Sequence, residues 1–284
     1  MDKEQSFILP RRAFVTTLVA GFTLAAGPVS ADAIVTDANG LEAGEVSIPV
    51  ADGVIPGYRA RPAGVRHAAV VLVIQEIFGV HEHIKDLCRR LAHAGYYAIA
   101  PSLYARQGDP GKYDMPHIMD LMKDIVAKVP DAQVMTDLDS TVAFAKGEGA
   151  ATRKLAITGF CWGGRVVWLY AAHSRALKAG VAWYGPLAGT DNAIRPHTAI
   201  ELAGEVKAPV LGLYAGLDQN IHQSDIDAMQ AALRASGNTA SRIDVFADAQ
   251  HGFNADYRPS YNEKDAKEGW ARMLSWFAQY GVGA

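Results

Sequence analysis

The stretch ITGFCWGGRVVWLYAAH, residues 157–173, joins two apolar runs through a turn crowded with glycines. The first run is typical of a buried strand, and the second is typical of a buried helix. Cys161 stands at the turn between them. A strand, a sharp turn and a helix in this order predict a nucleophile elbow, which projects one side chain above the edge of a sheet. A serine would be expected at that position, and here it is a cysteine.

Small residues stand on both sides of this turn. Gly159 and Gly163 lie two residues before and two residues after Cys161, and they leave room for a cramped backbone. The helix that begins after Cys161 directs the positive end of its dipole at the thiol, which stabilises a thiolate. The alternative is a small buried cysteine in a tight corner, because free cysteine packs well as an apolar residue. The surroundings favour the nucleophile.

Strand-like and helix-like segments alternate on both sides of this stretch. A strand pair is expected first, at 45–50 and 57–63. Further buried strands are expected at 68–76, 96–104, 154–160, 177–185, 208–216 and 241–249. Helical patterns occupy 81–95, 117–129, 132–147, 225–237 and 263–281. The alternation predicts an α/β fold with a mostly parallel central sheet and helices on both faces. No linker-like composition divides residues 32–284, which predicts a single domain.

A thiolate nucleophile needs a base and an acid. In folds with an elbow of this kind, these residues come from loops after later strands, in the order nucleophile, acid, histidine. Asp218 and His251 each follow a predicted strand directly, at the sheet edge where ligands bind in open α/β folds. His251 would accept the thiol proton, and Asp218 would hold the imidazole. Asp225 and Asp248 are alternatives for the acid, and both are more typical of surface residues.

Composition limits the classes of partner. Of the 284 residues, 50% are hydrophobic and 20% are charged, and the net charge is −3. A nucleic-acid partner is not expected, because phosphate binding needs clustered lysine and arginine. His81 and His83 could suggest a metal site, but no third ligand is spaced with them. Neither a metal nor another cofactor is expected.

The first residues resemble an export signal. Arg11 and Arg12 precede an uncharged run at 13–31, which ends in small residues suited to a signal peptidase. The paired arginines are similar to the twin-arginine type. Residues 1–31 are therefore predicted to be a cleaved signal, with the twin-arginine export machinery as a partner and a periplasmic or secreted location. An uncleaved membrane anchor is the alternative, and no stable anchor is expected after cleavage because the apolar span is short and weak.

The chain has two cysteines, Cys88 and Cys161. A disulfide is possible in an oxidising compartment. Cys88, however, lies on a predicted helix in an apolar pattern, whereas Cys161 lies at a turn far along the chain. A buried, unpaired Cys88 is therefore the expectation.

Five segments, taken in order, resemble the dienelactone hydrolase family, the carboxymethylenebutenolidases and their relatives. They are QEIFGVHEH, LYARQG, GFCWGGR, AGLDQN and AQHGF. The resemblance spans nearly the whole chain after residue 31 and implies an α/β-hydrolase fold. It also implies a catalytic triad of Cys161, His251 and Asp218. The backbone N–H groups of Trp162 and Ile77 would form the oxyanion hole.

The same resemblance extends to residues around the triad. In the family, a glutamate at the position of Glu76 interacts with the cysteine and takes part in switching the thiol to its reactive state. Arg106 matches an arginine that holds a substrate carboxylate. A second family arginine is replaced here by Ala255, and Arg258 is a candidate to reach the site instead. Tyr184 is a candidate to line a pocket, although an aromatic residue near a turn is more often part of the core.

These observations predict an exported hydrolase of a carboxylic ester or lactone that acts through an acyl-enzyme on Cys161. A small-molecule ester or lactone would be its substrate. An exported thioesterase or peptidase on the same fold is an alternative. Outside the enzymes, the chain could be a non-catalytic protein that binds a small acid, or it could use Cys161 as a redox-sensing thiol.

Overall fold

The computed structural model describes residues 33–189 and 191–283, and its core is one eight-stranded sheet. The strands are β1 Leu41–Val50, β2 Gly53–Pro62, β3 Ala69–Ile74, β4 Tyr97–Pro101, β5 Ala151–Phe160, β6 Leu177–Trp183, β7 Val210–Ala215 and β8 Arg242–Phe246. Their order across the sheet is β1-β2-β4-β3-β5-β6-β7-β8. Each of these strands overlaps a segment that the sequence pattern predicts, so the α/β prediction is confirmed.

Strand direction follows from the connections. The tight turn at 51–52 makes β1 and β2 an antiparallel pair, and β2 also pairs antiparallel with β4. From β4 to β8 every neighbouring pair is parallel. The parallel strands are covered on both faces, which is why β3 reads AVVLVI and all of its residues are buried. Parallel strands bring their carboxyl ends to one edge, where the site lies.

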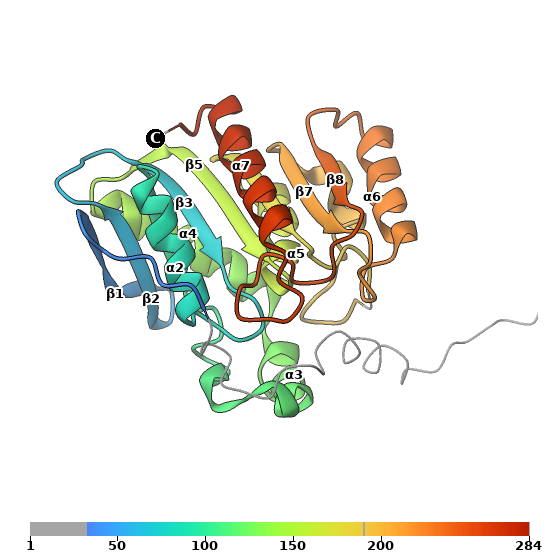
Figure 1. The fold of residues 1–284 in the computed structure, drawn as a ribbon, viewed down its shortest axis with the longest axis horizontal. Helices are drawn as coiled ribbons and strands as arrows, with labels where there is room; N and C mark the ends of the chain where they lie inside the picture. The colour runs from blue at the N-terminus through green and yellow to red at the C-terminus, as the bar shows by residue number, and fades with distance from the viewer. Residues whose placement is uncertain (1–32, 190, 284) are drawn as a thin grey trace, which may run out of the picture.

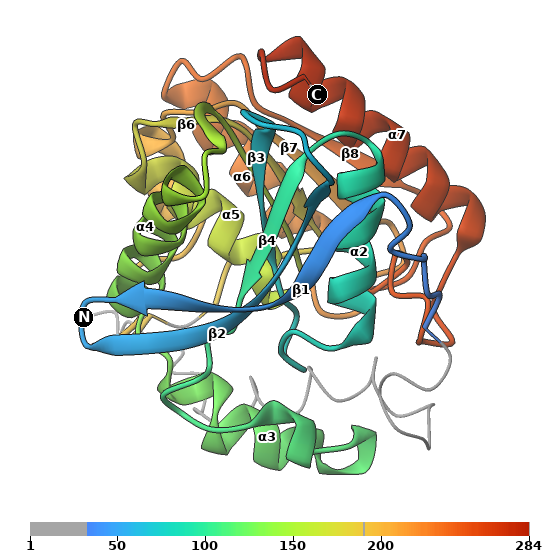
Figure 2. The same cartoon turned by 90° about the vertical axis from the view of Figure 1, so that its left-hand side faces the viewer.

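Helices cover both faces of the sheet. Helices α2 (Glu82–His93) and α7 (Glu263–Gln279) lie on one face, and α4 (Asp131–Gly147) and α5 (Trp162–His173) lie on the other (Figures 1 and 2). Helix α6 (Gln223–Ala235) packs near β8. Helix α3 (Ile118–Asp124) lies beyond the carboxyl edge of the sheet (Figure 1). Short 3-10 helices occupy Pro110–Lys112, Met115–His117, Val126–Lys128 and Glu201–Glu205.

Helix burial follows the apolar pattern. On α2, Ile84, Leu87 and Leu91 share the buried face, and on α7 Met273 and Phe277 do so. The residues of α5 are buried on nearly every side, because this helix lies between the sheet and other elements. Apolar burial of this kind stabilises a domain by roughly 25 cal/mol per Å² removed from water.

The predicted helix at 117–129 is shorter than the pattern suggests. Helix α3 ends at Asp124, and Ile125 has φ −120° and ψ −67°, outside the helical region. The guanidinium of Arg195 donates hydrogen bonds to the carbonyls of Val126 and Val129. These bonds hold the 3-10 turn Val126–Lys128 that stands in place of a further helical turn.

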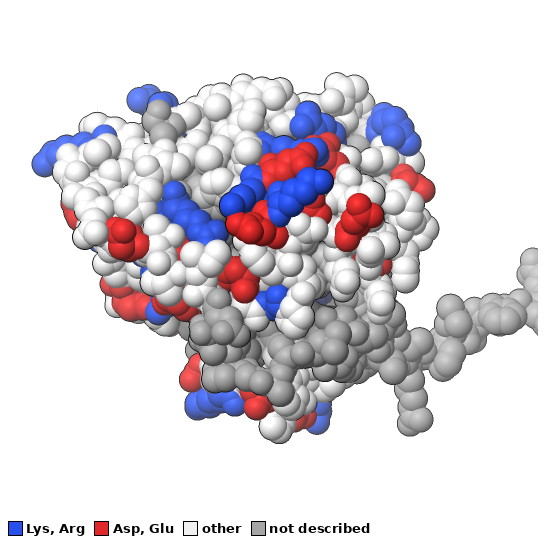
Figure 3. Space-filling view, viewed as in Figure 1, with Lys and Arg blue, Asp and Glu red and all other residues white. Residues whose placement is uncertain are grey.

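Charged side chains of both signs are intermixed over the face that carries α2 and α7 (Figure 3). Several are paired along these helices, as Lys267 is with Glu263 at 2.6 Å. Within the described residues, no helix is long and apolar enough to cross a membrane. Cys88 and Cys161 are both buried and free, as expected for Cys88. The predicted signal at residues 1–31 lies outside the described residues.

Candidate active site

Cys161 occupies a strained turn between β5 and α5. Its φ is 52° and its ψ is −116°, a backbone conformation that L-residues rarely adopt. The turn is held by three backbone hydrogen bonds. Cys161 N–H donates to the carbonyl of Trp183 at 3.0 Å, and the N–H groups of Gly164 and Arg165 donate to the carbonyl of Cys161 at 2.9 Å and 3.3 Å. The side chain is thereby placed at the carboxyl edge of the central strands.

The glycines beside Cys161 are required by close backbone contacts. A Cβ on Gly163 would lie 2.6 Å from the carbonyl oxygens of Ile74 and Gln75 at the end of β3. A Cβ on Gly159 would lie 2.3 Å from the carbonyl oxygen of Gly163. The elbow therefore packs directly on the neighbouring strand, and only hydrogen atoms fit at these two positions.

The structure brings Cys161, His251 and Asp218 together. His251 Nε2 lies 3.2 Å from Cys161 Sγ, and His251 Nδ1 lies 2.7 Å from Asp218 Oδ2. All three residues are buried. Asp218 follows β7 and His251 follows β8, so both loops reach the edge at which α5 begins. The three side chains thus form one hydrogen-bonded chain.

The second oxygen of Asp218 fixes the carboxylate. Asp218 Oδ1 accepts hydrogen bonds from the backbone N–H groups of Asn220 at 2.8 Å and Ile221 at 3.2 Å. Oδ2 is therefore directed at the imidazole of His251, and an acceptor there requires that Nδ1 carry a proton. This arrangement leaves Nε2 to exchange a proton with the thiol.

The electrostatics of the site favour an imidazolium. Burial lowers the pKa of His251, but the negative charges of Asp218 and Cys161 outweigh burial and raise it to about 10. A protonated His251 beside Cys161 stabilises the thiolate in turn. The thiolate is the form in which a cysteine is nucleophilic, so this environment suits a nucleophile at Cys161.

Glu76 lies fully buried just after β3. Its Oε2 accepts a hydrogen bond from the hydroxyl of Tyr257, and Arg258 Nη2 lies 3.4 Å from the same oxygen. Burial lowers the pKa of Arg258, but Glu76 and the hydroxyl of Tyr257 outweigh it and raise that pKa, so the guanidinium stays charged. The negative charge of Glu76 is compensated inside the protein.

The sequence pattern predicts neither the contact of Tyr257 with Glu76 nor the role of Asp256 in holding the loop that carries Tyr257. Arg258 does reach the site, as the sequence allows, whereas Ala255 is simply buried. The neighbouring Asp256 fixes this loop to α2, because its carboxylate contacts His83 Nδ1 at 2.9 Å and Arg90 Nη2 at 3.1 Å. The one signal in the sequence is the order Asp-Tyr-Arg shortly after His251, and nothing in it identifies the partner as Glu76.

Trp162 and Ile77 lie where backbone donors are expected. Trp162 is the first residue of α5, and N–H groups in the first turn of a helix have no partner within the helix. Ile77 follows Glu76, and both Trp162 and Ile77 are buried beside the elbow. The ring of Trp162 packs edge-on against Tyr104, with 4.9 Å between ring centroids.

The two candidate substrate-binding residues differ in their surroundings. Arg106 is held by two carboxylates: it pairs with Asp52 in the β1–β2 turn and with Asp137 of α4, the latter at 2.8 Å. Tyr184 is fully buried, and its ring packs edge-on against the imidazole of His251 at 5.2 Å. Tyr184 therefore packs directly on the imidazole of His251, while the charge of Arg106 is already matched.

The remaining candidates lie apart from the triad. Asp225 caps α6 by accepting from the backbone N–H of His222, and Asp248 is exposed. The rings of His81 and His83 stack with 6.1 Å between centroids. Among the described residues, no group of three or more His, Cys, Asp or Glu side chains is placed to hold a metal ion.

The mostly parallel sheet, the elbow and the buried chain of Cys161, His251 and Asp218 are those of an α/β-hydrolase fold. The chain belongs to the dienelactone hydrolase family, whose model matches residues 55–281. It is 56% identical to a candidate carboxymethylenebutenolidase of Methylorubrum extorquens over 280 residues, which cover 98% of this chain and 95% of the relative. A candidate carboxymethylenebutenolidase of Salmonella typhimurium is 52% identical over 267 residues, 94% of this chain and 98% of the relative.

A solved structure supports the same assignment. The candidate dienelactone hydrolase of Klebsiella pneumoniae is 54% identical, with a TM-score of 0.81, and the match covers 84% of this chain and 99% of that one. The protein is therefore an enzyme of a carboxymethylenebutenolidase-like hydrolase family, which is consistent with action on carboxylic esters or lactones.

Proposed function

We propose that this protein hydrolyses a carboxylic ester or lactone through an acyl-enzyme formed on Cys161. The observation that carries the proposal is the continuous chain from Asp218 through His251 to Cys161, with contacts of 2.7 Å and 3.2 Å. The same geometry offers a nucleophile, a proton carrier and a fixed carboxylate at the carboxyl edge of the sheet.

The first half-reaction forms a bond from Cys161 Sγ to the ester carbonyl carbon. The carbonyl oxygen becomes an oxyanion, for which the N–H groups of Trp162 and Ile77 are the donors. Collapse of this intermediate breaks the bond to the alkoxy oxygen, and His251 Nε2 gives that oxygen its proton. Asp218 supports the imidazolium while it exists.

The second half-reaction releases the acyl group. His251 Nε2, now neutral, takes a proton from water as the water oxygen attacks the thioester carbon. Cys161 then leaves as a thiolate, and the imidazolium is restored beside it. A lactone opens by the same two steps, except that its alkoxy group stays attached to the acyl product.

Glu76 has a separate part in this proposal. A bare carboxylate near Cys161 would repel a thiolate. Its contacts with Tyr257 and Arg258 compensate that charge, so the thiolate of Cys161 can persist. We assign Glu76 the role of setting the charge around the nucleophile rather than of reacting with substrate.

The test compares the two cysteines. Hydrolysis of p-nitrophenyl acetate and of a lactone should fall at least about a thousandfold in Cys161→Ala, because loss of a catalytic nucleophile costs several orders of magnitude. Cys88→Ala is the matched control and should keep activity within about twofold. Circular dichroism establishes that both variants fold.

Other outcomes separate the alternatives. Full activity in Cys161→Ala would refute the nucleophile. Turnover of thioesters or peptides with none of oxygen esters would favour the thioesterase or peptidase. Rapid, reversible modification of Cys161 by peroxide without any turnover would favour a redox-sensing thiol, and tight binding of a small acid without turnover would favour a binding protein.

A further inference from the structure

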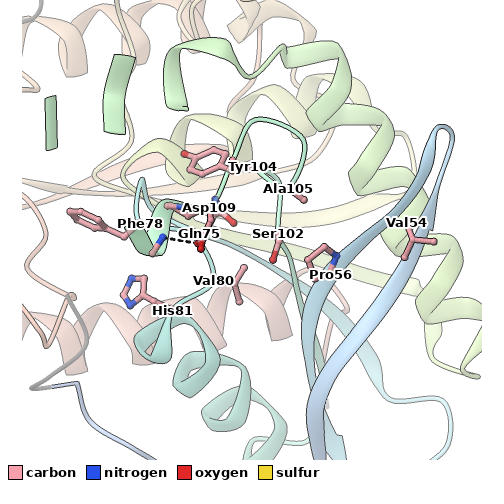
Figure 4. A pocket seen from close by; sticks show the side chains of 14 residues that line it. Val54, Pro56, Gln75, Phe78, Val80, His81, Ser102, Tyr104, Ala105 and Asp109 are labelled. Atoms are coloured by element: carbon pink, nitrogen blue, oxygen red, sulfur yellow. Dashed lines mark hydrogen bonds between the residues drawn. The ribbon is translucent and has the colours of Figure 1, made fainter. Parts of the chain in front are cut away.

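A cavity of about 630 Å³ adjoins the elbow at the carboxyl edge of the sheet. It lies between the loop that follows β3 and the loop that follows β4 (Figure 4). Two of its lining residues touch the elbow. Gln75 lies against Gly163 through its backbone carbonyl, and Tyr104 packs against the ring of Trp162. A molecule in this cavity is therefore next to the residues that flank Cys161.

Three neutral side chains that line this cavity have unused hydrogen-bonding atoms. Both amide atoms of Gln75, both ring nitrogens of His81 and the hydroxyl of Tyr104 are buried without a well-formed hydrogen bond among the described residues, and the Gln75 amide lies close enough to Tyr104 to act on the pKa of its hydroxyl. Gln75 is 0% exposed and Tyr104 is 1% exposed. In the view of Figure 4, Gln75 lies between Tyr104 and His81. Buried polar atoms are nearly always paired, so these atoms indicate a ligand that completes them.

The three side chains stay uncharged. Burial lowers the pKa of His81 well below its usual range, with a smaller contribution from His83. Burial also raises the pKa of Tyr104 well above its usual range. Gln75 does not titrate. Each of the three groups therefore offers both a donor and an acceptor at neutral pH.

The charges around the cavity disfavour an anion. Among the described residues that line it, Asp109 is the charged one, and none is a lysine or arginine. Asp109 Oδ1 accepts from the backbone N–H of Gly111 at 2.9 Å, drawn as a dashed line in Figure 4. Arg106 and Arg258 are the arginines that could hold a substrate carboxylate, and both are already paired. Arg106 pairs with Asp52 and Asp137, and Arg258 pairs with Glu76.

We propose that this cavity binds an uncharged, hydroxyl-bearing part of the substrate through Gln75, His81 and Tyr104. The proposal rests on the ester or lactone hydrolysis proposed above and narrows it to neutral hydroxylated esters or lactones. It differs from the role that the sequence resemblance implies for Arg106, which is to hold a carboxylate of the substrate.

The chemistry of the three groups selects a hydroxyl over the other substituents. A hydroxyl donates one hydrogen bond and accepts others, as each side chain in the cavity also does. A carboxylate only accepts, so it would leave the amide oxygen of Gln75 unsatisfied and would lie near Asp109. A purely apolar substrate would bury all of these polar atoms without partners, which weakens binding markedly.

The test compares three lactones in the wild-type enzyme. They are γ-butyrolactone, its α-hydroxy derivative, and a derivative with a carboxylate on the γ carbon. Hydrolysis is followed by proton release, and each kcat/KM is divided by the rate of hydroxide-catalysed hydrolysis to remove intrinsic reactivity. The hydroxylated lactone should exceed γ-butyrolactone by about tenfold, the effect of one or two hydrogen bonds, and the carboxylate should be the poorest.

Three conservative variants locate the preference. Gln75→Met, His81→Phe and Tyr104→Phe keep the approximate shape of each side chain and remove its hydrogen bonds. In each variant the ratio of hydroxylated to plain lactone should fall about threefold or more toward one, mainly through KM. Tyr280→Phe is the matched control, because that hydroxyl bonds to the carbonyl of Ala240, and the ratio should be unchanged.

The outcomes separate this inference from the function on which it rests. If Cys161→Ala abolishes hydrolysis but the wild type has no preference for the hydroxylated lactone, the inference fails and the function stands. A preference for the carboxylate that Arg106→Ala removes would overturn the inference in favour of that role for Arg106. If the wild type hydrolyses none of the lactones or esters, the function fails. Calorimetric binding of the three lactones then decides the inference, which survives only if the hydroxylated one binds selectively.

Discussion

At Cys161, a φ of 52° places the thiol within 3.2 Å of an imidazole whose pKa is raised to about 10 by interactions with Asp218 and Cys161 that outweigh burial. The thiol chemistry thus depends on one unusual backbone conformation and one carboxylate. Cys88 shows the contrast: burial raises the pKa of that thiol far above its usual range, and it remains an unreactive part of the core.

Asp218→Asn should lower both activity and the pKa of His251. The wild-type pKa of about 10 depends on the charge of Asp218, so a neutral amide should move it toward the ordinary value of about 6.5. The measurement is NMR titration of the His251 ring proton. An Asp-to-Asn change at a triad typically lowers kcat about ten-thousandfold. An unchanged pKa would show that Asp218 does not control the imidazole.

The same raised pKa predicts how stability depends on pH. A group whose pKa is higher in the folded state binds its proton more tightly there, so it stabilises the fold at low pH. For His251 this contribution is full below about pH 6.5 and is lost as pH rises toward about 10. The free energy of unfolding in urea, measured across this pH range, should show that in Asp218→Asn the contribution of His251 is lost at a lower pH than in the wild type.

Individual residues differ in how far the sequence predicts them. The order Cys161, Asp218, His251, each after a parallel strand, was sufficient to predict that three residues distant in the chain lie together. The partners of Glu76 were not predictable, because Tyr257 lies in an irregular loop and no periodicity places such a residue. The ion pairs of Arg106 were also not predictable, since both carboxylates come from other parts of the chain.

At the scale of elements, the elbow is a contact between a turn and a neighbouring strand. Gly163→Ala should destabilise the protein by about 3 kcal/mol, because its Cβ would lie 2.6 Å from backbone carbonyls that cannot move independently. Gly147→Ala, at the end of α4, is the matched control: its Cβ would meet nothing within 4 Å. That change should be neutral or stabilising by up to about 1 kcal/mol.

Urea unfolding measures both changes, and the catalytic rate of Gly163→Ala gives a second measurement. Displacement of the elbow moves Sγ of Cys161 relative to His251, so we expect a fall in kcat that is larger than any change in KM. Equal unfolding free energies for the two variants would mean that the close approach of Gly163 to β3 does not limit the fold.

Elements with a strong periodicity were predicted well. The apolar runs that became β3 to β8 and the amphipathic pattern of α2 are examples, because burial on one or both faces determines their composition. The segment 117–129 was not predicted well, because its second half is a 3-10 turn that bonds to Arg195, a residue 69 positions away from Val126 in the chain. Tertiary hydrogen bonds of this kind override local propensity.

For the whole molecule, the alternation of strands and helices was enough to predict the α/β class, since helix-covered parallel strands leave a distinctive composition. The antiparallel edge formed by β1 and β2 followed from a short turn. The location of the protein in the cell stays a prediction, because it rests on residues 1–31, outside the described part of the chain.

That prediction has a direct test. Residues 1–35 fused to a green fluorescent protein should deliver the fluorescent reporter to the periplasm of a bacterial host, because the twin-arginine route carries folded proteins. Replacing Arg11 and Arg12 together by lysine should abolish delivery, and a host without the twin-arginine translocase should fail equally. Delivery that survives both changes would refute this route.

The hydrogen bond between His251 and Cys161 joins residues 90 positions apart, and that between Tyr257 and Glu76 joins residues 181 apart. Contacts so distant in the chain form late in folding, after the entropy of closing long loops has been overcome. In the proposed mechanism, the thiol of Cys161 therefore acquires its base only when β8 has joined the sheet. A newly made chain passes through its folding pathway with an unactivated cysteine, and recovery of hydrolysis after refolding should lag behind recovery of helical structure.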